Sequence, residues 1–240
     1  PGEKEAVARI ARTLARRGTT SFLPTATTHA PEVLLRAARA VQAAWESEEA
    51  DGTPGASILG LHLEGPFLEP AMRGAHPEEH IRPVDLEEVD RIAGAAGGWG
   101  TAGRPGLAMV TLSPEVEGAA EAVRALSARG VVVAMGHTAA PESAVAAFLE
   151  AGARFAVHAF NRYRAPGEDP SLSGPSPASL SSDPMRTVRS DPRLRAGIVA
   201  DGVHVKPEIL ADFVRARGGD RTVLTSDLVS DGGLSGEGGK

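Results

Sequence analysis

The stretch LAMVTLSPEVEGAAEAVRALSARGVVVAMG (107–136) sets the expectation for the fold. Its first part, LAMVTL (107–112), and its last part, VVVAMG (131–136), are short apolar runs of the kind that form strands buried on both faces. Between them, PEVEGAAEAVRALSARG (114–130) has a helical pattern and ends in glycine. Two buried strands joined by a helix form a β-α-β unit, in which the strands lie parallel.

The same alternation continues on both sides of this unit. Five further runs are expected to be strands: SFLPT (21–25), ASILGLHL (56–63), RFAVH (154–158), AGIVA (196–200) and TVLTSD (222–227). Helical patterns are expected at 4–17, 31–47, 85–96, 140–151 and 207–217. Seven strands that alternate with helices indicate an α/β fold, either an open doubly wound sheet or a (β/α)8 barrel one strand short. No glycine-rich phosphate loop follows any of these runs, which disfavours a nucleotide-binding sheet.

Composition excludes several functions. The 240 residues include 25 Lys and Arg against 31 Asp and Glu, and the net charge of -6 argues against nucleic acid as the main partner. Without cysteine there is no disulfide scaffold and no thiolate ligand, so a metal must be held by His, Asp or Glu. No apolar run approaches the ~20 residues that cross a bilayer, and the charged first residues do not resemble a signal peptide. A cytoplasmic protein is expected.

One segment departs from the alternation. Residues 165–192 are rich in Pro, Ser and Gly and are expected to form a long loop. The loop is expected to lie within a single domain that spans residues 1–240.

Polar side chains mark the expected carboxyl ends of several strands. Glu64 and Asp227 end two of them, His137 and His158 lie at the ends of two others, and His204 follows a fifth. Because parallel strands in a barrel end on the same face, these side chains are expected to converge there. One carboxylate and two imidazoles, from Glu64, His137 and His158, suit a divalent cation such as Zn²⁺ and leave room for a water that the metal acidifies. Asp227 could take the proton from that water and pass it to a leaving group.

Several other polar residues could have either a structural or a functional role. A single His or acid at a strand end is more often satisfied by its loop than used as a ligand, so the argument depends on their number. His62 precedes Glu64 by two positions and is either a support of the metal ligands or a hydrogen-bonded core residue. Arg162 and Arg164 flank Tyr163 and could clamp a phosphate or lie exposed in a loop.

The motifs of the chain, in their order and approximate spacing, resemble the N-acetylglucosamine-6-phosphate deacetylase family of the amidohydrolase superfamily. The resemblance is carried by GLHLEGPFLEPAMRGAHP (60–77), MGHTAA (135–140), HAFN (158–161), GIVADGVHV (197–205) and LTSD (224–227), with GTTSFLPT (18–25) fitting the family's second barrel strand. It implies a TIM-type (β/α)8 barrel with a small flanking β-sandwich. We expect this chain to be a fragment with seven of the eight strands and without the sandwich.

The resemblance also implies a reaction. It is the metal-dependent hydrolysis of the acetamide of N-acetylglucosamine 6-phosphate to glucosamine 6-phosphate and acetate, a step of amino sugar catabolism. By motif, Glu64, His137 and His158 are expected to bind one divalent metal ion, with Zn²⁺ the expected metal. Asp227 is expected to act as the general base and then as the general acid.

The same motifs imply a set of substrate contacts. The backbone of Ala75 and the side chain of His76 are expected to contact the sugar, and Asn161 to touch the substrate. His204 is expected to help bind the substrate and its phosphate. Arg164 matches the arginine of the family's REPG motif, a phosphate ligand that reaches across a dimer interface, and the complete protein is expected to be a homodimer.

Three departures from the family pattern leave alternatives open. The loop after HAFN (158–161) is shortened, a Ser/Pro-rich stretch is inserted before the next strand, and LVSDGG (228–233) follows the TSD motif. The chain could therefore be an amidohydrolase for another N-acyl amino sugar. It could also be a degenerate, non-catalytic barrel that binds a sugar phosphate or a partner.

Overall fold

A computed structural model describes residues 4–51, 55–100, 105–165, 167–169 and 175–227 of the chain. The segment LVSDGG (228–233), one of the departures from the family pattern, lies outside the described residues.

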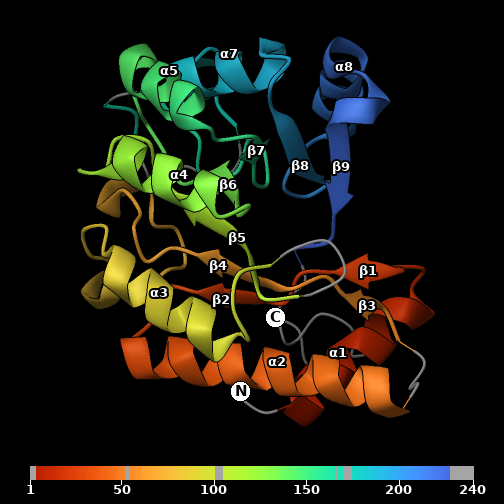
Figure 1. The fold of residues 1–240 in the computed structure, drawn as a ribbon. Helices are drawn as coiled ribbons and strands as arrows, with labels where there is room; N and C mark the ends of the chain where they lie inside the picture. The colour runs from red at the N-terminus through yellow and green to blue at the C-terminus, as the bar shows by residue number, and fades with distance from the viewer. Residues whose placement is uncertain (1–3, 52–54, 101–104, 166, 170–174, 228–240) are drawn as a thin grey trace.

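The centre of the fold is a parallel, curled sheet in which every strand lies beside its predecessor (Figure 1). Its order is β2 (Thr25–Thr27), β4 (Leu61–Glu64), β5 (Leu107–Leu112), β6 (Val132–Met135), β7 (Phe155–Ala156), β8 (Arg195–Val199) and β9 (Thr222–Thr225). A doubly wound sheet reverses its strand order at a switch point, and this sheet does not. The sheet is therefore an incomplete TIM-type barrel with seven strands, as expected. Among the described residues, no strand joins β9 to β2.

Two of the expected strands are each divided into two. The runs 21–25 and 56–63 supply a small separate sheet, β1 (Ser21–Phe22) with β3 (Ser57–Ile58), before they continue into β2 and β4. Pro24 interrupts the first run because proline has no N–H to donate to a ladder. Gly60 interrupts the second run. Its φ is 130°, and a Cβ at this position would clash with Gly106 O at 2.8 Å, so the position requires glycine. The expectation of two continuous strands is wrong for this reason.

The helices surround the curve of the strands (Figure 1). They include α1 (Lys4–Arg16), α2 (Pro31–Asp51), α3 (Leu86–Ala95), α4 (Ala119–Ala128), α5 (Glu142–Ala151) and α8 (Pro207–Arg217), with short 3-10 turns η1 (Pro70–Met72), η2 (Glu78–His80) and η3 (Gly219–Arg221). The core joins the inner faces of these helices to the strands, for example Leu34 and Ile92 to Val110 and Val133. No helix in the described ranges is both long enough and apolar enough to cross a membrane.

The segment 165–192 is not a continuous loop. It contains α6 (Pro177–Leu180) and α7 (Asp183–Ser190), so the sequence expectation is corrected for its second half. Ser176 and Ser182 are N-caps whose side chains accept from the backbone N–H of Ser179 and Met185. Met185 and Val188 are buried on one face of α7, three residues apart. The serines and prolines that suggested a loop therefore start helices.

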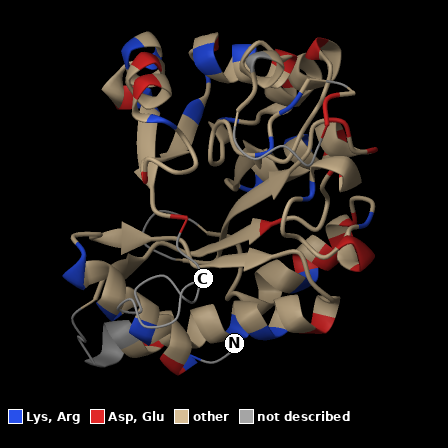
Figure 2. Cartoon of the chain, turned by 180° about the vertical axis from the view of Figure 1, so that it is seen from behind, with Lys and Arg blue, Asp and Glu red and all other residues tan. Residues whose placement is uncertain are grey.

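The charged residues are spread over the helices and loops, while the strands hold few of them (Figure 2). The strands at the centre of the sheet are largely buried and apolar, as Leu61, Leu63 and Val110 illustrate, whereas β9 at its edge exposes Leu224. Against this background, Glu64 at the end of β4 is an exception, because its carboxylate is also buried. A buried charge needs a compensating partner.

Gly136 directly follows β6 and is closely surrounded by side chains that lie on or just after the neighbouring strands. A Cβ at this position would lie 2.5 Å from Val157 Cγ2 and 3.0 Å from Thr111 Cγ2. We expect Gly136→Ala to lower the free energy of unfolding by about 1–3 kcal/mol through overpacking. Gly94→Ala in α3, where a Cβ meets nothing within 4 Å, should raise that free energy by about 0.5–1 kcal/mol. Urea denaturation of both variants checks the pair, and equal stabilities would contradict the packing argument.

Candidate metal centre

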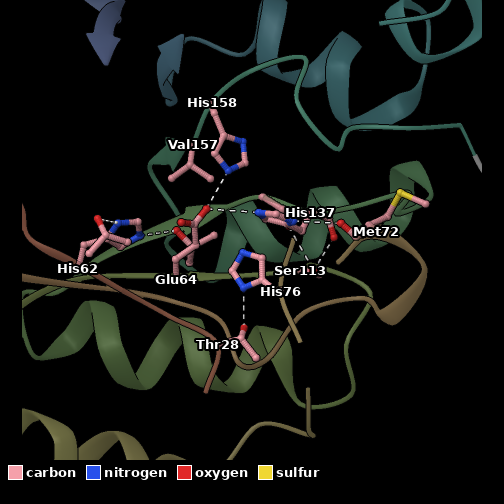
Figure 3. A network of polar contacts seen from close by, with 12 residues as sticks. Thr28, His62, Glu64, Met72, His76, Ser113, His137, Val157 and His158 are labelled. Atoms are coloured by element: carbon pink, nitrogen blue, oxygen red, sulfur yellow. Dashed lines mark hydrogen bonds and ion pairs between the residues drawn. The ribbon is translucent and has the colours of Figure 1, made fainter. Parts of the chain in front are cut away.

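Three side chains from separate strands meet inside the sheet. Glu64 is the last residue of β4, and His137 and His158 each follow their strand, β6 or β7, by two residues. One ligand atom from each of the three residues lies within 4.8 Å of the others, and all three residues are buried (Figure 3). The structure thus brings together the three residues that the sequence singled out as metal ligands.

The backbone at these positions has an unusual conformation. The φ angles of His137, His158 and Asp227 are 52°, 28° and 45°, in the left-handed region that non-glycine residues rarely adopt. Such conformations cost of order 1–3 kcal/mol each and persist where the surroundings fix them. Each strand therefore ends in a sharp turn at its polar residue.

The imidazole of His137 faces two acceptors. Its Nδ1 lies 3.0 Å from Met72 O, and its Nε2 lies 3.3 Å from Glu64 Oε1. A neutral imidazole has a single N–H and can satisfy only one of them. A ring that donates from Nδ1 to Met72 presents the lone pair of Nε2 toward the carboxylate. A cation placed between them satisfies both groups.

The imidazole of His158 makes the shorter contact with the same carboxylate oxygen. Its Nε2 lies 2.7 Å from Glu64 Oε1, while its buried Nδ1 has no hydrogen-bond partner within the described part of the chain. Burial lowers the pKa of His158, but the hydrogen bond and charge of Glu64 oppose it and leave that pKa above its usual value. Glu64 therefore attracts positive charge into the buried site.

The carboxylate of Glu64 remains ionised in this environment. Burial raises its pKa, but the hydrogen-bond contacts of His137 and His158 outweigh burial and hold the pKa well below its usual range. One ionised carboxylate and two imidazoles are a donor set that Zn²⁺ accepts. The three residues fit a divalent cation by the chemistry of their donor atoms and by their proximity.

His76, expected to contact the sugar, borders this cluster. Its ring lies edge-on to that of His137, with centroids 4.6 Å apart, and its Nδ1 lies 2.7 Å from Thr28 Oγ1. Burial lowers the pKa of His76 to about 4, so the ring is neutral near pH 7. Ala75 beside it is exposed, and half-buried Asn161 donates its backbone N–H to His158 O. His76 and Asn161 thus border the metal-ligand cluster, and Ala75 is adjacent to His76 in the sequence.

His62 is held by neighbours on both sides. Its Nδ1 lies 3.1 Å from Thr25 Oγ1 on β2, and its Nε2 lies 2.8 Å from Thr111 Oγ1 on β5. Both ring nitrogens are thus engaged, and burial lowers the pKa of the ring. Of the two readings left open by the sequence, the geometry favours a hydrogen-bonded core histidine.

Asp227 ends its strand on the side of the cluster. It is exposed, and its negative charge raises the pKa of both His62 and His158. Asp227 therefore interacts electrostatically with His158, one of the three proposed ligands, and is accessible to solvent.

The two expected phosphate ligands differ from each other in exposure. His204 lies on the loop after β8, 46% exposed, with its Nδ1 2.6 Å from Asp201 Oδ2. Arg164 is only 2% exposed, and its Nη1 donates to Tyr163 O. The cause is a bridge between Thr138 and Tyr163, in which Arg164 N donates to Thr138 O at 3.0 Å. The expectation of Arg164 as an accessible phosphate ligand is therefore not supported by its position.

Sequence reasoning missed the groups that support the ligands. Met72 contributes a carbonyl to His137, and Ser113 contributes a hydroxyl to the carbonyl of the same residue. The only sequence signal for Ser113 was its place immediately after LAMVTL (107–112), at a strand end. A backbone carbonyl such as that of Met72 has no sequence signal.

The fold and the cluster together define an α/β barrel protein with a candidate site for a divalent metal at the carboxyl ends of its strands. Among proteins of known name, the chain is similar to N-acetylglucosamine-6-phosphate deacetylases. The human enzyme of that name is 34% identical over 229 residues, which cover 95% of this chain and 52% of the enzyme. The Bacillus subtilis enzyme of that name is 31% identical over 92% of this chain and 51% of its own length. No family model matches the chain.

Solved structures agree with this similarity. The deacetylase of that name from Mycobacterium smegmatis has a TM-score of 0.73 and 31% identity, and covers 96% of this chain and 52% of its own. A mutant of that enzyme, in complex with N-acetyl-D-glucosamine-6-phosphate, has a TM-score of 0.72 at 31% identity over 95% of this chain and 51% of its own. The family resemblance expected from the motifs is confirmed. The chain spans about half the length of the curated relatives that it matches.

The cluster generates a direct prediction about metal binding. We expect the chain to bind one zinc ion. His137→Ala should weaken zinc binding by on the order of 100-fold or more, because losing a ligand lowers metal affinity more than losing a group that only orients a ligand. His80→Ala is the control, since the His80 ring stacks on His29 and does not border the cluster. Competition with a chromophoric chelator measures both affinities. Equal zinc affinity in the His137→Ala variant and the unmodified chain would exclude His137 as a ligand.

Proposed function

We propose that this chain carries the metal centre of an N-acetylglucosamine-6-phosphate deacetylase and takes part in amino sugar catabolism. The single observation that supports it most is the buried group of Glu64, His137 and His158 at the ends of three strands. That group occurs in a chain that is 34% identical to the human enzyme of that name. The reaction is hydrolysis of the acetamide to acetate and glucosamine 6-phosphate.

The three ligands would hold one divalent cation, and Zn²⁺ suits a set of one carboxylate and two imidazoles. Bound there, the cation supplies a Lewis acid that polarises a carbonyl and lowers the pKa of a water molecule. Burial of Glu64 keeps bulk water from competing with its charge.

Asp227 moves the proton in this proposal. Its carboxylate accepts a proton from the attacking water as the water oxygen bonds to the acetamide carbon. When the carbon–nitrogen bond breaks, Asp227 returns that proton to the amine nitrogen. Water is thereby divided between the two products, and the aspartate ends the cycle unchanged.

Residues that border the ligands would bind the sugar. We assign Ala75, His76 and Asn161 to the sugar and His204 to its phosphate, and support comes from the motif match and, for His76, from its contact with His137. Arg164 stays a candidate phosphate ligand by motif alone, because its side chain is buried. A homodimer and a cytoplasmic location are proposed from the resemblance.

The deciding experiment is acetate release from N-acetylglucosamine 6-phosphate by the purified chain, with and without a chelator. We expect release that stops with chelator and returns with zinc. Binding of the substrate without release would instead favour the degenerate barrel. If only a different N-acyl amino sugar is hydrolysed, that sugar would replace N-acetylglucosamine 6-phosphate as the proposed substrate.

Substitution of the proposed base separates chemistry from metal binding. We expect Asp227→Asn to abolish acetate release, because an amide cannot accept the proton, while the zinc content stays at its original level. The control is Asp220→Asn, which changes a different exposed aspartate that lies in η3, and this variant should retain activity. Acetate assay and metal analysis of both variants check this. Loss of zinc in Asp227→Asn would contradict the assigned role.

The phosphate contact assigned to His204 can be isolated by comparing two substrates. We expect His204→Ala to raise KM for N-acetylglucosamine 6-phosphate by about 10–100-fold, the cost of a hydrogen bond to a charged group. KM for unphosphorylated N-acetylglucosamine should not change. Steady-state kinetics on both substrates give the ratio, and an equal rise for both would remove His204 from the phosphate site.

A further inference from the structure

Ser113 joins two of the ligand-bearing segments through one buried hydroxyl. It directly follows β5, which pairs with β4 on one side and β6 on the other. Its Oγ donates to His137 O at 2.7 Å and accepts from Glu69 N at 2.8 Å, and its own N–H donates to Phe67 O at 3.1 Å (Figure 3). The loop that follows Glu64 is thus tied to the backbone of His137.

Tyr163 makes the corresponding connection between the next two strand ends. Its hydroxyl lies 2.7 Å from Met135 O, at the end of β6, and 3.0 Å from Val157 O, just before His158. The single hydroxyl hydrogen can be donated to either carbonyl. The ring is fully buried, so water does not replace these contacts.

These two hydroxyls act where the backbone is strained. His137 and His158 both have positive φ, and neither residue would keep that conformation without surrounding constraints. Ser113 holds the carbonyl of His137, while Tyr163 contacts the carbonyl of Met135, two residues before His137, and that of Val157, just before His158. Neither hydroxyl group is a metal ligand. Their contacts set the separation of the strand ends from which the ligands project.

We propose that Ser113 and Tyr163 are positioning residues that hold Glu64, His137 and His158 at metal-binding separation before a metal arrives. The inference rests on the metal site of the proposed function. Outer partners of metal ligands typically contribute 10–100-fold to metal affinity because the ligands need not be ordered upon binding. Removing either hydroxyl loosens one junction between the strand ends without changing any of the three ligand residues.

The test measures zinc affinity and compares it with that of a variant that loses a similar hydrogen bond away from the ligands. Ser113→Ala and Tyr163→Phe are each expected to weaken zinc binding by about tenfold. Tyr163→Phe keeps the buried ring, so it tests the inference even where Ser113→Ala does not fold. Ser127→Ala is the matched control, since Ser127 also donates to a backbone carbonyl, that of Gly152, between α4 and the end of α5. Its zinc affinity should equal that of the unmodified chain.

The outcomes distinguish this inference from the function on which it rests. If the unmodified chain binds no zinc, the proposed metal site fails and the inference fails with it. If the unmodified chain binds zinc and Ser113→Ala and Tyr163→Phe bind it equally well, only the inference is overturned. A loss in Ser127→Ala as large as in the other two variants also overturns it, because the effect would then be general loosening. Melting temperatures of the metal-free proteins are measured in parallel.

Discussion

The contact of one buried carboxylate with two imidazoles constrains the centre of this molecule. Glu64 is 6% exposed and lies within 3.3 Å of His137 Nε2 and 2.7 Å of His158 Nε2. An isolated buried carboxylate would be expensive, so its position demands positive charge nearby. Two imidazoles face this carboxylate, and a divalent cation bound by the three groups would supply that charge. The strand ends, turns and supporting hydroxyls are arranged so that these three groups meet.

Much of the site follows from the sequence because a parallel sheet imposes a simple rule. Polar residues at the ends of apolar runs lie on one face, and that rule alone brought Glu64, His137 and His158 together. The helical ends and strand interiors follow in the same way from apolar periodicity. The rule works best for the central strands, which are largely buried on both sides. Polar residues mark the ends of these strands, although His62 and Thr111 lie buried within β4 and β5.

The rest depended on interactions that apolar patterns do not record. Pro24 and Gly60 divide two runs through the lack of an N–H and an unusual φ, although both were visible in the sequence. The caps Ser176 and Ser182 were mistaken for loop residues because serine suits both roles. Arg164 follows the bridge between Thr138 and Tyr163, and its side chain is buried. This pairing joins residues far apart in the sequence, so no local sequence pattern predicts it.

The distance along the chain between the ligands gives this centre a role in assembly. The contact of Glu64 with His158 spans 94 residues, and that with His137 spans 73. Bringing together groups so far apart in the chain carries an entropic cost. An ion bound by all three groups would therefore favour the folded arrangement over partly assembled ones, and the supply of metal would be coupled to the yield of folded chains.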